Sequence, residues 1–126
     1  MSSTTTEPLV LWVDDQPQNN AAERRTLAAF GILTTSVHST RQAMAQLKSW
    51  RFAAIISDMG RWEGPTEGYE LLDQVRGLGI KTPFFIYAGS KQPEHVREAL
   101  ARGANGCTNE HRALVELVRA AVANAG

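Results

Sequence analysis

The stretch Leu9-Val10-Leu11-Trp12-Val13-Asp14-Asp15 decides the fold, because an apolar run of strand length ends at two adjacent carboxylates. Short apolar runs bounded by polar segments are typical of buried strands. In open α/β sheets, ligands bind beyond the carboxyl ends of the strands. Two neighbouring negative charges at such an end indicate either a bound divalent cation, which prefers hard oxygen ligands, or the N-terminus of a following helix.

Length and composition describe one domain. The 126 residues are enough to bury a hydrophobic core without disulfides or structural metals, and the single cysteine, Cys107, excludes an internal disulfide. Basic and acidic residues number 13 each without single-sign runs, which argues against a nucleic acid or a membrane surface as the main partner. Residues 1–7 lack the pattern of a signal peptide, and no apolar stretch would span a bilayer. We therefore expect a cytoplasmic protein with a flexible leader (1–7) and one domain (8–126).

Apolar runs alternate with amphipathic segments along the rest of the chain, which predicts a parallel sheet covered by helices. Five strands are expected, at Leu9–Val13, Ile32–Val37, Ala53–Ser57, Pro83–Tyr87 and Gly106–Thr108. Five helices are expected, at Asn20–Phe30, Thr40–Trp50, Tyr69–Leu78, Glu94–Arg102 and about His111–Asn124. Gly31, Gly79 and Gly103 follow three of these helices, where a left-handed C-cap requires glycine. Trp12 and Trp50 fall within these patterns and are expected in the core or at its edge.

Right-handed crossovers bring the carboxyl ends of all five strands to one edge of the sheet. Asp14 and Asp15 follow the first strand and Asp58 follows the third, so three carboxylates converge there. Two such charges ~4 Å apart repel by roughly 4 kcal/mol at an effective dielectric of 20. Magnesium would relieve this repulsion, since it accepts one or two carboxylates, keeps several waters and bridges to phosphate. The alternative is that each Asp caps a helix or loop, but their joint placement favours a metal and phosphoryl site.

Five segments, in this order and spacing, resemble the receiver domain of two-component response regulators. They are Val13-Asp14-Asp15-Gln16-Pro17, Ile55-Ile56-Ser57-Asp58-Met59, Gly68-Tyr69-Glu70-Leu71-Leu72, Thr82-Pro83-Phe84-Phe85-Ile86-Tyr87-Ala88 and Gly103-Ala104-Asn105-Gly106. The resemblance extends from about Leu9 to Val122. It implies an α/β, flavodoxin-like, doubly wound five-stranded parallel sheet of strand order 2-1-3-4-5, with helices on both faces.

The resemblance also implies roles for the acidic residues. Asp58 would accept a phosphoryl group from a partner histidine kinase or phosphotransfer protein. Asp15 and Asp58 would ligate Mg²⁺ directly, Asp14 would hold it through water, and the backbone carbonyl of Gly60 would complete the protein ligands. Attack by the Asp58 carboxylate on a phosphohistidine needs positioning and charge neutralisation, and the cation supplies part of both.

Three positions depart from the family pattern. The hydroxyl residue expected after the fourth strand, which hydrogen-bonds the phosphoryl group, falls on Ala88. The lysine expected after the fifth strand falls on Glu110, whose carboxylate would repel a phosphoryl dianion, although an acid there also suits the N-terminus of the last helix. The aromatic side chain expected to change rotamer on activation falls on Cys107, which is too small to do so.

Other polar residues are candidates to replace the lost groups. Ser90 lies two residues after Ala88, and Lys91 or Arg61 could bring a cation to the pocket; each is otherwise an ordinary loop residue. The loop after Asp58 is about two residues longer than the family pattern. Its Trp62 is a candidate partner contact or a cover for the pocket, and a locally packed side chain is the alternative.

Two functional hypotheses follow. The first is a single-domain receiver that is phosphorylated at Asp58 and signals by protein–protein interaction. The second is a pseudo-receiver, a phosphorylation-independent interaction module of the same fold. An enzyme on this fold is less well supported, because Gln16-Pro17-Gln18-Asn19 lacks the composition of a flavin phosphate loop. The usual partner surface of the family corresponds here to Glu94–Arg102 and Thr108–Arg119.

Overall fold

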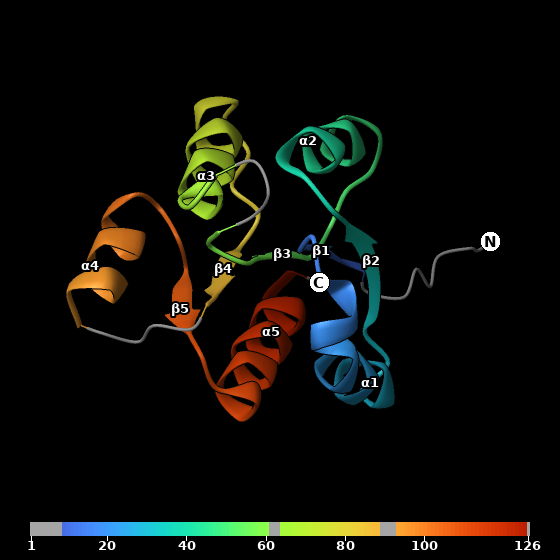
Figure 1. Cartoon of the computed structure of the whole chain (residues 1–126). Helices are drawn as coiled ribbons and strands as arrows, with labels where there is room; N and C mark the ends of the chain where they lie inside the picture. Colours follow the sequence, from blue (N-terminus) through green and yellow to red (C-terminus); the bar gives the residue numbers. More distant parts are fainter. Residues whose placement is uncertain (1–8, 61–63, 89–92, 126) are drawn as a thin grey trace.

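The computed structural model describes residues 9–60, 64–88 and 93–125. These residues form a five-stranded parallel sheet of order β2-β1-β3-β4-β5 (Figure 1). The strands are β1 (Leu9–Val13), β2 (Leu33–Val37), β3 (Ala54–Ser57), β4 (Phe84–Tyr87) and β5 (Gly106–Thr108). The sheet confirms the fold class and the strand order expected from the sequence.

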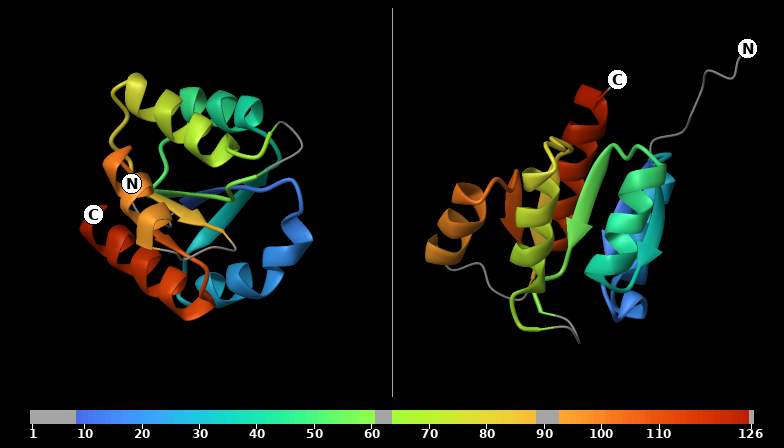
Figure 2. Two further views of the ribbon diagram at one scale, coloured as in Figure 1. Left: turned by 60° about the vertical axis from the view of Figure 1, so that its left-hand side comes forward. Right: turned by 90° about the horizontal axis from the view of Figure 1, so that it is seen from above.

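Helices cover both faces of this sheet. They are η1 (Pro17–Asn20), a 3₁₀ turn, and α1 (Ala21–Ala29), α2 (Thr40–Ser49), α3 (Glu67–Gly77), α4 (Pro93–Ala101) and α5 (His111–Ala125). Figure 2 shows α1 and α5 together on one face and α2 and α3 on the other, while α4 lies at the β5 end of the sheet. Among the described residues, no helix is both long and apolar enough to cross a membrane.

The side chains of β1 alternate between two cores, as successive residues of a strand point to opposite faces. Leu11 and Val13 belong to the core under α2 and α3, whereas Val10 and Trp12 belong to the core under α1 and α5. Because β1 is buried on both faces, its register relative to β2 and β3 is strongly specified. This register fixes where the chain leaves the sheet and therefore where the acidic residues lie.

Three helices end at the glycines that the sequence predicts as C-caps, and one of the two tryptophans expected in the core is buried. Gly31, Gly79 and Gly103 have φ of 79°, 79° and 109°, which confirms the three predicted left-handed C-caps. Trp12 is 1% exposed and confirms the expected core position. Trp50 does not, since it is 63% exposed. It is the C-cap of α2, where φ −136° and ψ 152° turn the chain into an extended conformation and take the indole off the packed helix face.

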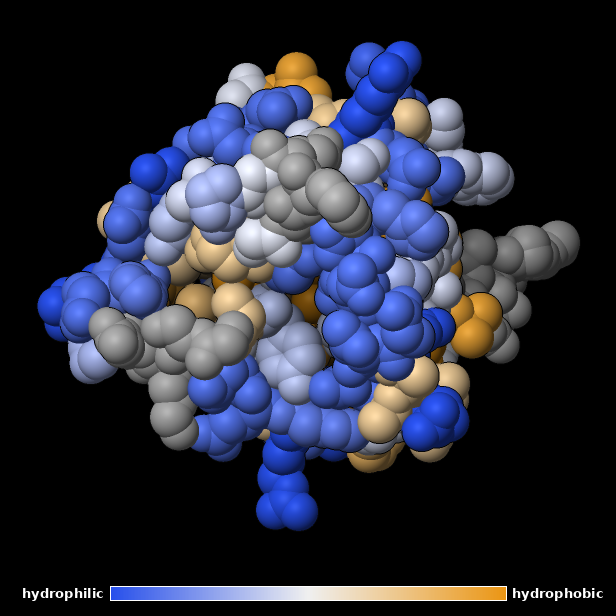
Figure 3. Space-filling model, viewed as in Figure 1, coloured by the Kyte–Doolittle hydropathy of each residue, from blue (hydrophilic) through white to orange (hydrophobic). Residues whose placement is uncertain are grey.

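One face of the molecule is mostly polar (Figure 3). Figure 3 shows one face of the molecule, on which hydrophilic residues predominate and hydrophobic residues form a few separate patches. Phe30, the C-cap of α1, is one of the exposed large hydrophobic residues. The ring is 50% exposed and lies 3.9 Å from the guanidinium carbon of Arg119, measured to the ring centroid. A cation–π contact from α5 therefore covers part of it.

Candidate functional site

The structure brings Asp14, Asp15 and Asp58 together at the carboxyl edge of the sheet. One carboxylate oxygen of each residue lies within 4.8 Å of the other two, and all three residues are half-buried. The sheet hydrogen bonding continues into these residues. The amide of Asp14 donates to the carbonyl of Val37 (2.9 Å), and the amide of Asp58 donates to the carbonyl of Val13 (3.1 Å). The acidic positions are thus set by the register of three adjacent strands.

The carboxylate of Asp14 is held by two donors from the segment that follows it. The backbone amide of Gln16 donates to Oδ1 (2.8 Å), and the side-chain amide of Asn20 donates to Oδ2 (3.2 Å). Asn20 in turn accepts a hydrogen bond from Nε of Arg24 (2.7 Å). Asn20 and Arg24 were not predicted as site residues, because only the fold of η1 brings the side chain of Asn20 to Asp14.

The N-terminus of α3 packs directly against the chain that carries Asp58. The amide of Gly68 donates to the carbonyl of Met59 (2.8 Å), and a Cβ at Gly68 would lie 2.4 Å from the backbone oxygen of Asp58. The buried hydroxyl of Ser57 donates to that same oxygen (2.8 Å). Only glycine permits this approach, so Gly68 is a structural requirement for the position of Asp58.

The donor set fits a hard divalent cation. Carboxylate oxygens are the ligands that Mg²⁺ prefers, and three carboxylates so close together repel one another without a counter-charge. Gly60, the predicted carbonyl ligand, is exposed and lies two residues after Asp58. The cluster Asp14, Asp15 and Asp58 is hereafter called the acidic pocket.

The departures from the family pattern lie around the same edge. Ala88 follows β4, and its amide donates to the carbonyl of Thr108 (3.1 Å). Glu110 is exposed, and its amide donates to the Thr108 hydroxyl (3.2 Å) immediately before α5. The remaining candidates Arg61, Trp62, Ser90 and Lys91 lie outside the described residues.

Cys107 is half-buried in β5, and burial raises the pKa of its thiol. The thiol is therefore protonated at neutral pH and is a weak nucleophile. Tyr69 of α3 lies in the core under α2 and α3, against which Cys107 packs, and burial followed by the negative charge of Glu98 raises the pKa of the Tyr69 phenol. An aromatic ring from α3 thus lies near the position where the family has one on β5.

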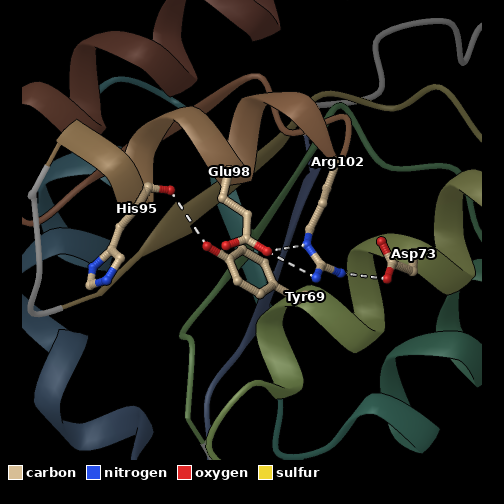
Figure 4. Close-up of polar contacts among 5 residues, drawn as sticks. All are labelled: Tyr69, Asp73, His95, Glu98 and Arg102. Atoms are coloured by element: carbon tan, nitrogen blue, oxygen red, sulfur yellow. Dashed lines mark hydrogen bonds and ion pairs between the residues drawn. The ribbon is translucent and has the colours of Figure 1, made fainter.

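Tyr69 also connects α3 to α4 (Figure 4). Its hydroxyl lies 3.5 Å from the carbonyl oxygen of His95, and the guanidinium carbon of Arg102 lies 4.5 Å from its ring centroid. Arg102 is held over the ring by ion pairs to Asp73 (2.8 Å) and Glu98 (2.9 Å). Because these pairs are exposed, each contributes at most about 1 kcal/mol.

A second tyrosine ties β4 to α1. The hydroxyl of Tyr87 donates to the carboxylate of Glu23 (2.6 Å), and its ring meets Trp12 edge-on at 6.0 Å between centroids. Burial raises the pKa of Tyr87 far above its ordinary value, and the hydrogen bond to Glu23 adds to this shift. The phenol thus stays protonated and keeps donating across the physiological pH range.

A comparison with known protein families finds a match to the response regulator receiver domain over residues 10–121. The chain belongs to this family. The match covers almost the whole sequence, and it confirms the resemblance found from the five segments. Receiver domains are signalling modules that bind Mg²⁺ at a cluster of Asp residues.

Solved structures agree with this assignment. The receiver domain of the Francisella response regulator 1452 superposes with a TM-score of 0.85 at 22% identity, covering 94% of this chain and 99% of that one. The chemotaxis response regulator CheY4 of Vibrio cholerae superposes with a TM-score of 0.74 at 25% identity, covering 96% of this chain and 100% of that one. The receiver domain of a Syntrophus aciditrophicus signal transduction histidine kinase superposes with a TM-score of 0.78 at 24% identity, covering 93% of this chain and 91% of that one. No curated protein matches the sequence.

Proposed function

We propose that this receiver domain accepts a phosphoryl group on Asp58 in a Mg²⁺-dependent reaction and passes the signal on through protein–protein contacts. The observation that carries the proposal is the acidic pocket, in which Asp58 and the two carboxylates after β1 lie within 4.8 Å of one another. The phosphodonor is the phosphohistidine of a histidine kinase or phosphotransfer protein, and the setting is the cytoplasm. The domain comprises residues 8–126.

In the proposed reaction, an Asp58 carboxylate oxygen attacks phosphorus in line with the histidine nitrogen. The O–P bond forms as the P–N bond breaks, and the departing imidazole takes a proton from solvent. Asp15, Asp58 and the Gly60 carbonyl would hold Mg²⁺ directly, and Asp14 would hold it through a water. When bound there, the cation would neutralise charge on the phosphoryl oxygens. The backbone contacts of Asp58 with Val13, Ser57 and Gly68 keep the nucleophile in place.

The output surface in this proposal is formed by α4, β5 and α5. Tyr69 of α3 contacts His95 of α4 and Arg102, the residue after α4, so α3 and α4 are directly connected (Figure 4). Movement of α3 relative to Asp58 would therefore reach the surface that a downstream protein contacts. The partner is a protein rather than a nucleic acid or a membrane, because positive and negative charges balance over the chain.

A second candidate function is supported by Ala88 and Glu110. Alanine offers no hydroxyl to a phosphoryl group, and a carboxylate at position 110 repels one. A pseudo-receiver, which binds its partner without being phosphorylated, would tolerate both residues. The two functions differ in one measurable property, the formation of an acyl phosphate.

Incubation with acetyl phosphate and Mg²⁺ is expected to add the mass of one phosphoryl group to the full chain, as measured by intact-mass spectrometry at neutral pH. EDTA is expected to prevent the addition, because the acidic pocket then lacks its counter-charge. An ordinary receiver domain labelled in parallel is the positive control. If that domain is labelled and this one is not, the phosphorylation proposal is wrong and the pseudo-receiver is favoured.

Glu110→Lys is expected to raise the initial labelling rate about tenfold, because a cation replaces an anion at the edge of the pocket. Because Glu110 is exposed, the substitution should lower the activation free energy by only about 1.4 kcal/mol, well below the interaction energy of a buried charge pair. Raising the salt concentration should reduce the gain. Glu116→Lys, the same change at another exposed glutamate within α5, is the matched control and should leave the rate unchanged. Equal rates for both variants would contradict the proposed repulsion.

A further inference from the structure

We propose that Asn20 and Arg24 are positioning residues for the metal site, acting as a relay that orients the Asp14 carboxylate before a cation binds. This inference rests on the proposed function, since it assigns a task to residues behind the acidic pocket. It is carried by the hydrogen bonds that link Arg24 to Asn20 (2.7 Å) and Asn20 to Asp14 (3.2 Å).

Asn20 uses its side chain for Asp14 rather than for the helix that it precedes. Asparagine is among the favoured N-cap residues because its side-chain oxygen accepts a hydrogen bond from the first turn. Asn20 is the N-cap of α1, yet its side chain makes no capping hydrogen bond. Its oxygen accepts from Arg24 and its nitrogen donates to Asp14. The residue is only 3% exposed, so these bonds form away from competing water.

Arg24 is fixed at both ends of its guanidinium. Nε donates to Asn20, and Nη2 donates to the backbone carbonyl of Pro17 (2.9 Å) in η1. The first bond polarises the amide of Asn20, which strengthens the bond that the amide nitrogen gives to Asp14. The second bond holds η1 against α1, so that the three residues keep one arrangement.

The relay fixes the orientation of the Asp14 carboxylate. Both carboxylate oxygens already accept a hydrogen bond, Oδ1 from the Gln16 amide and Oδ2 from Asn20. A carboxylate oriented in this way loses little conformational entropy when a cation arrives. It also retains lone pairs that can accept hydrogen bonds from a metal-bound water, which matches the water-mediated role proposed for Asp14. Partners behind metal ligands typically change metal affinity 10- to 100-fold when mutated.

The relay and simple electrostatics predict opposite signs for one variant. Arg24 is a cation near a cation site, so its removal should strengthen Mg²⁺ binding if only charge mattered. If Arg24 acts through Asn20, its removal should weaken binding because Asp14 loses its orientation. The sign of the change in the dissociation constant therefore distinguishes the two explanations.

The test is calorimetric titration of the full chain with MgCl₂, alongside urea unfolding to verify that every variant is folded at the titration temperature. Asn20→Ala is expected to weaken Mg²⁺ binding about tenfold, and Arg24→Met about threefold. The double variant should match Asn20→Ala alone, because the effect of Arg24 passes through Asn20. Arg24→Lys, which keeps a donor, should bind more tightly than Arg24→Met. Arg25→Met, an exposed neighbour on α1, is the matched control and should bind as the wild type does.

Tighter binding by Arg24→Met, or multiplicative effects in the double variant, would overturn the relay. Unchanged binding by a folded Asn20→Ala would do the same. Asp15→Asn separates this outcome from a failure of the proposed function. If the wild type binds Mg²⁺ and Asp15→Asn does not, the metal site is established whatever the relay variants do. If the wild type does not bind Mg²⁺, both the metal site and the relay are wrong.

Discussion

Asp58→Asn is expected to reduce labelling by acetyl phosphate to background. The substitution replaces a charged carboxylate oxygen by a neutral amide, which is a far weaker nucleophile, while it keeps the size of the side chain. The backbone contacts that place residue 58, to Val13 and Ser57, do not involve the side chain of Asp58 and are retained. Loss of labelling is measured by intact-mass spectrometry on variants whose urea unfolding midpoints are compared with that of the wild type.

Asp73→Asn is the matched control for this substitution. Asp73 is an exposed carboxylate of α3 that pairs with Arg102, away from the acidic pocket. Its variant should be labelled at the wild-type rate, since it changes the same chemical group without touching the nucleophile. Persistent labelling of Asp58→Asn at one equivalent would show that another residue is the acceptor. Peptide mapping of the labelled wild type would then identify that residue.

The arrangement of strands and the convergence of the three carboxylates could be predicted because both depend on local patterns. Asp14 directly follows the apolar run of β1, and Asp58 directly follows that of β3. Because the strands are parallel, their carboxyl ends, and with them these carboxylates, meet at one edge of the sheet. The pattern was misleading at Trp50, because helical periodicity predicts burial only as far as the helix continues. The chain becomes extended at this residue, and its indole is exposed.

The supporting contacts could not be predicted in the same way. The sequence offers Asn20 as an N-cap, and only the folded η1 shows that its side chain is used by Asp14 instead. In the sequence, Tyr69 only marks the start of a predicted helix, whereas in the structure its ring contacts the guanidinium of Arg102, the residue after α4. Both contacts join residues whose spacing in sequence carries no periodic signal. They depend on how far one element lies from another in three dimensions.

Gly68 has the second large expected effect. Gly68→Ala is expected to lower the free energy of unfolding by about 3 kcal/mol, at the upper end of the usual range for overpacking. The new Cβ would lie 2.4 Å from the backbone oxygen of Asp58 and 3.1 Å from the Met59 Cα. These are backbone atoms at the end of a central strand, so neither can move away as a flexible side chain could. Urea unfolding monitored by circular dichroism measures the loss.

Gly77→Ala separates this clash from the general effect of alanine in a helix. Gly77 is the last residue of α3, and a Cβ there meets nothing within 4 Å. That control should therefore be neutral or slightly stabilising, by up to about 1 kcal/mol. The two substitutions are chemically identical and lie in one helix, so a difference between them reports on the contact with Asp58.

The same clash should slow labelling of the fraction of Gly68→Ala that remains folded. Relief of the contact requires α3 and the end of β3 to separate, which moves the Asp58 carboxylate relative to Asp14 and Asp15. Misplacement of a reacting group by about 1 Å can cost on the order of 100-fold in rate. We therefore expect labelling at least about tenfold slower than in Gly77→Ala at a temperature where both are folded. Equal rates and equal stabilities would show that the backbone near Asp58 adjusts freely and that Gly68 does not set the position of the nucleophile.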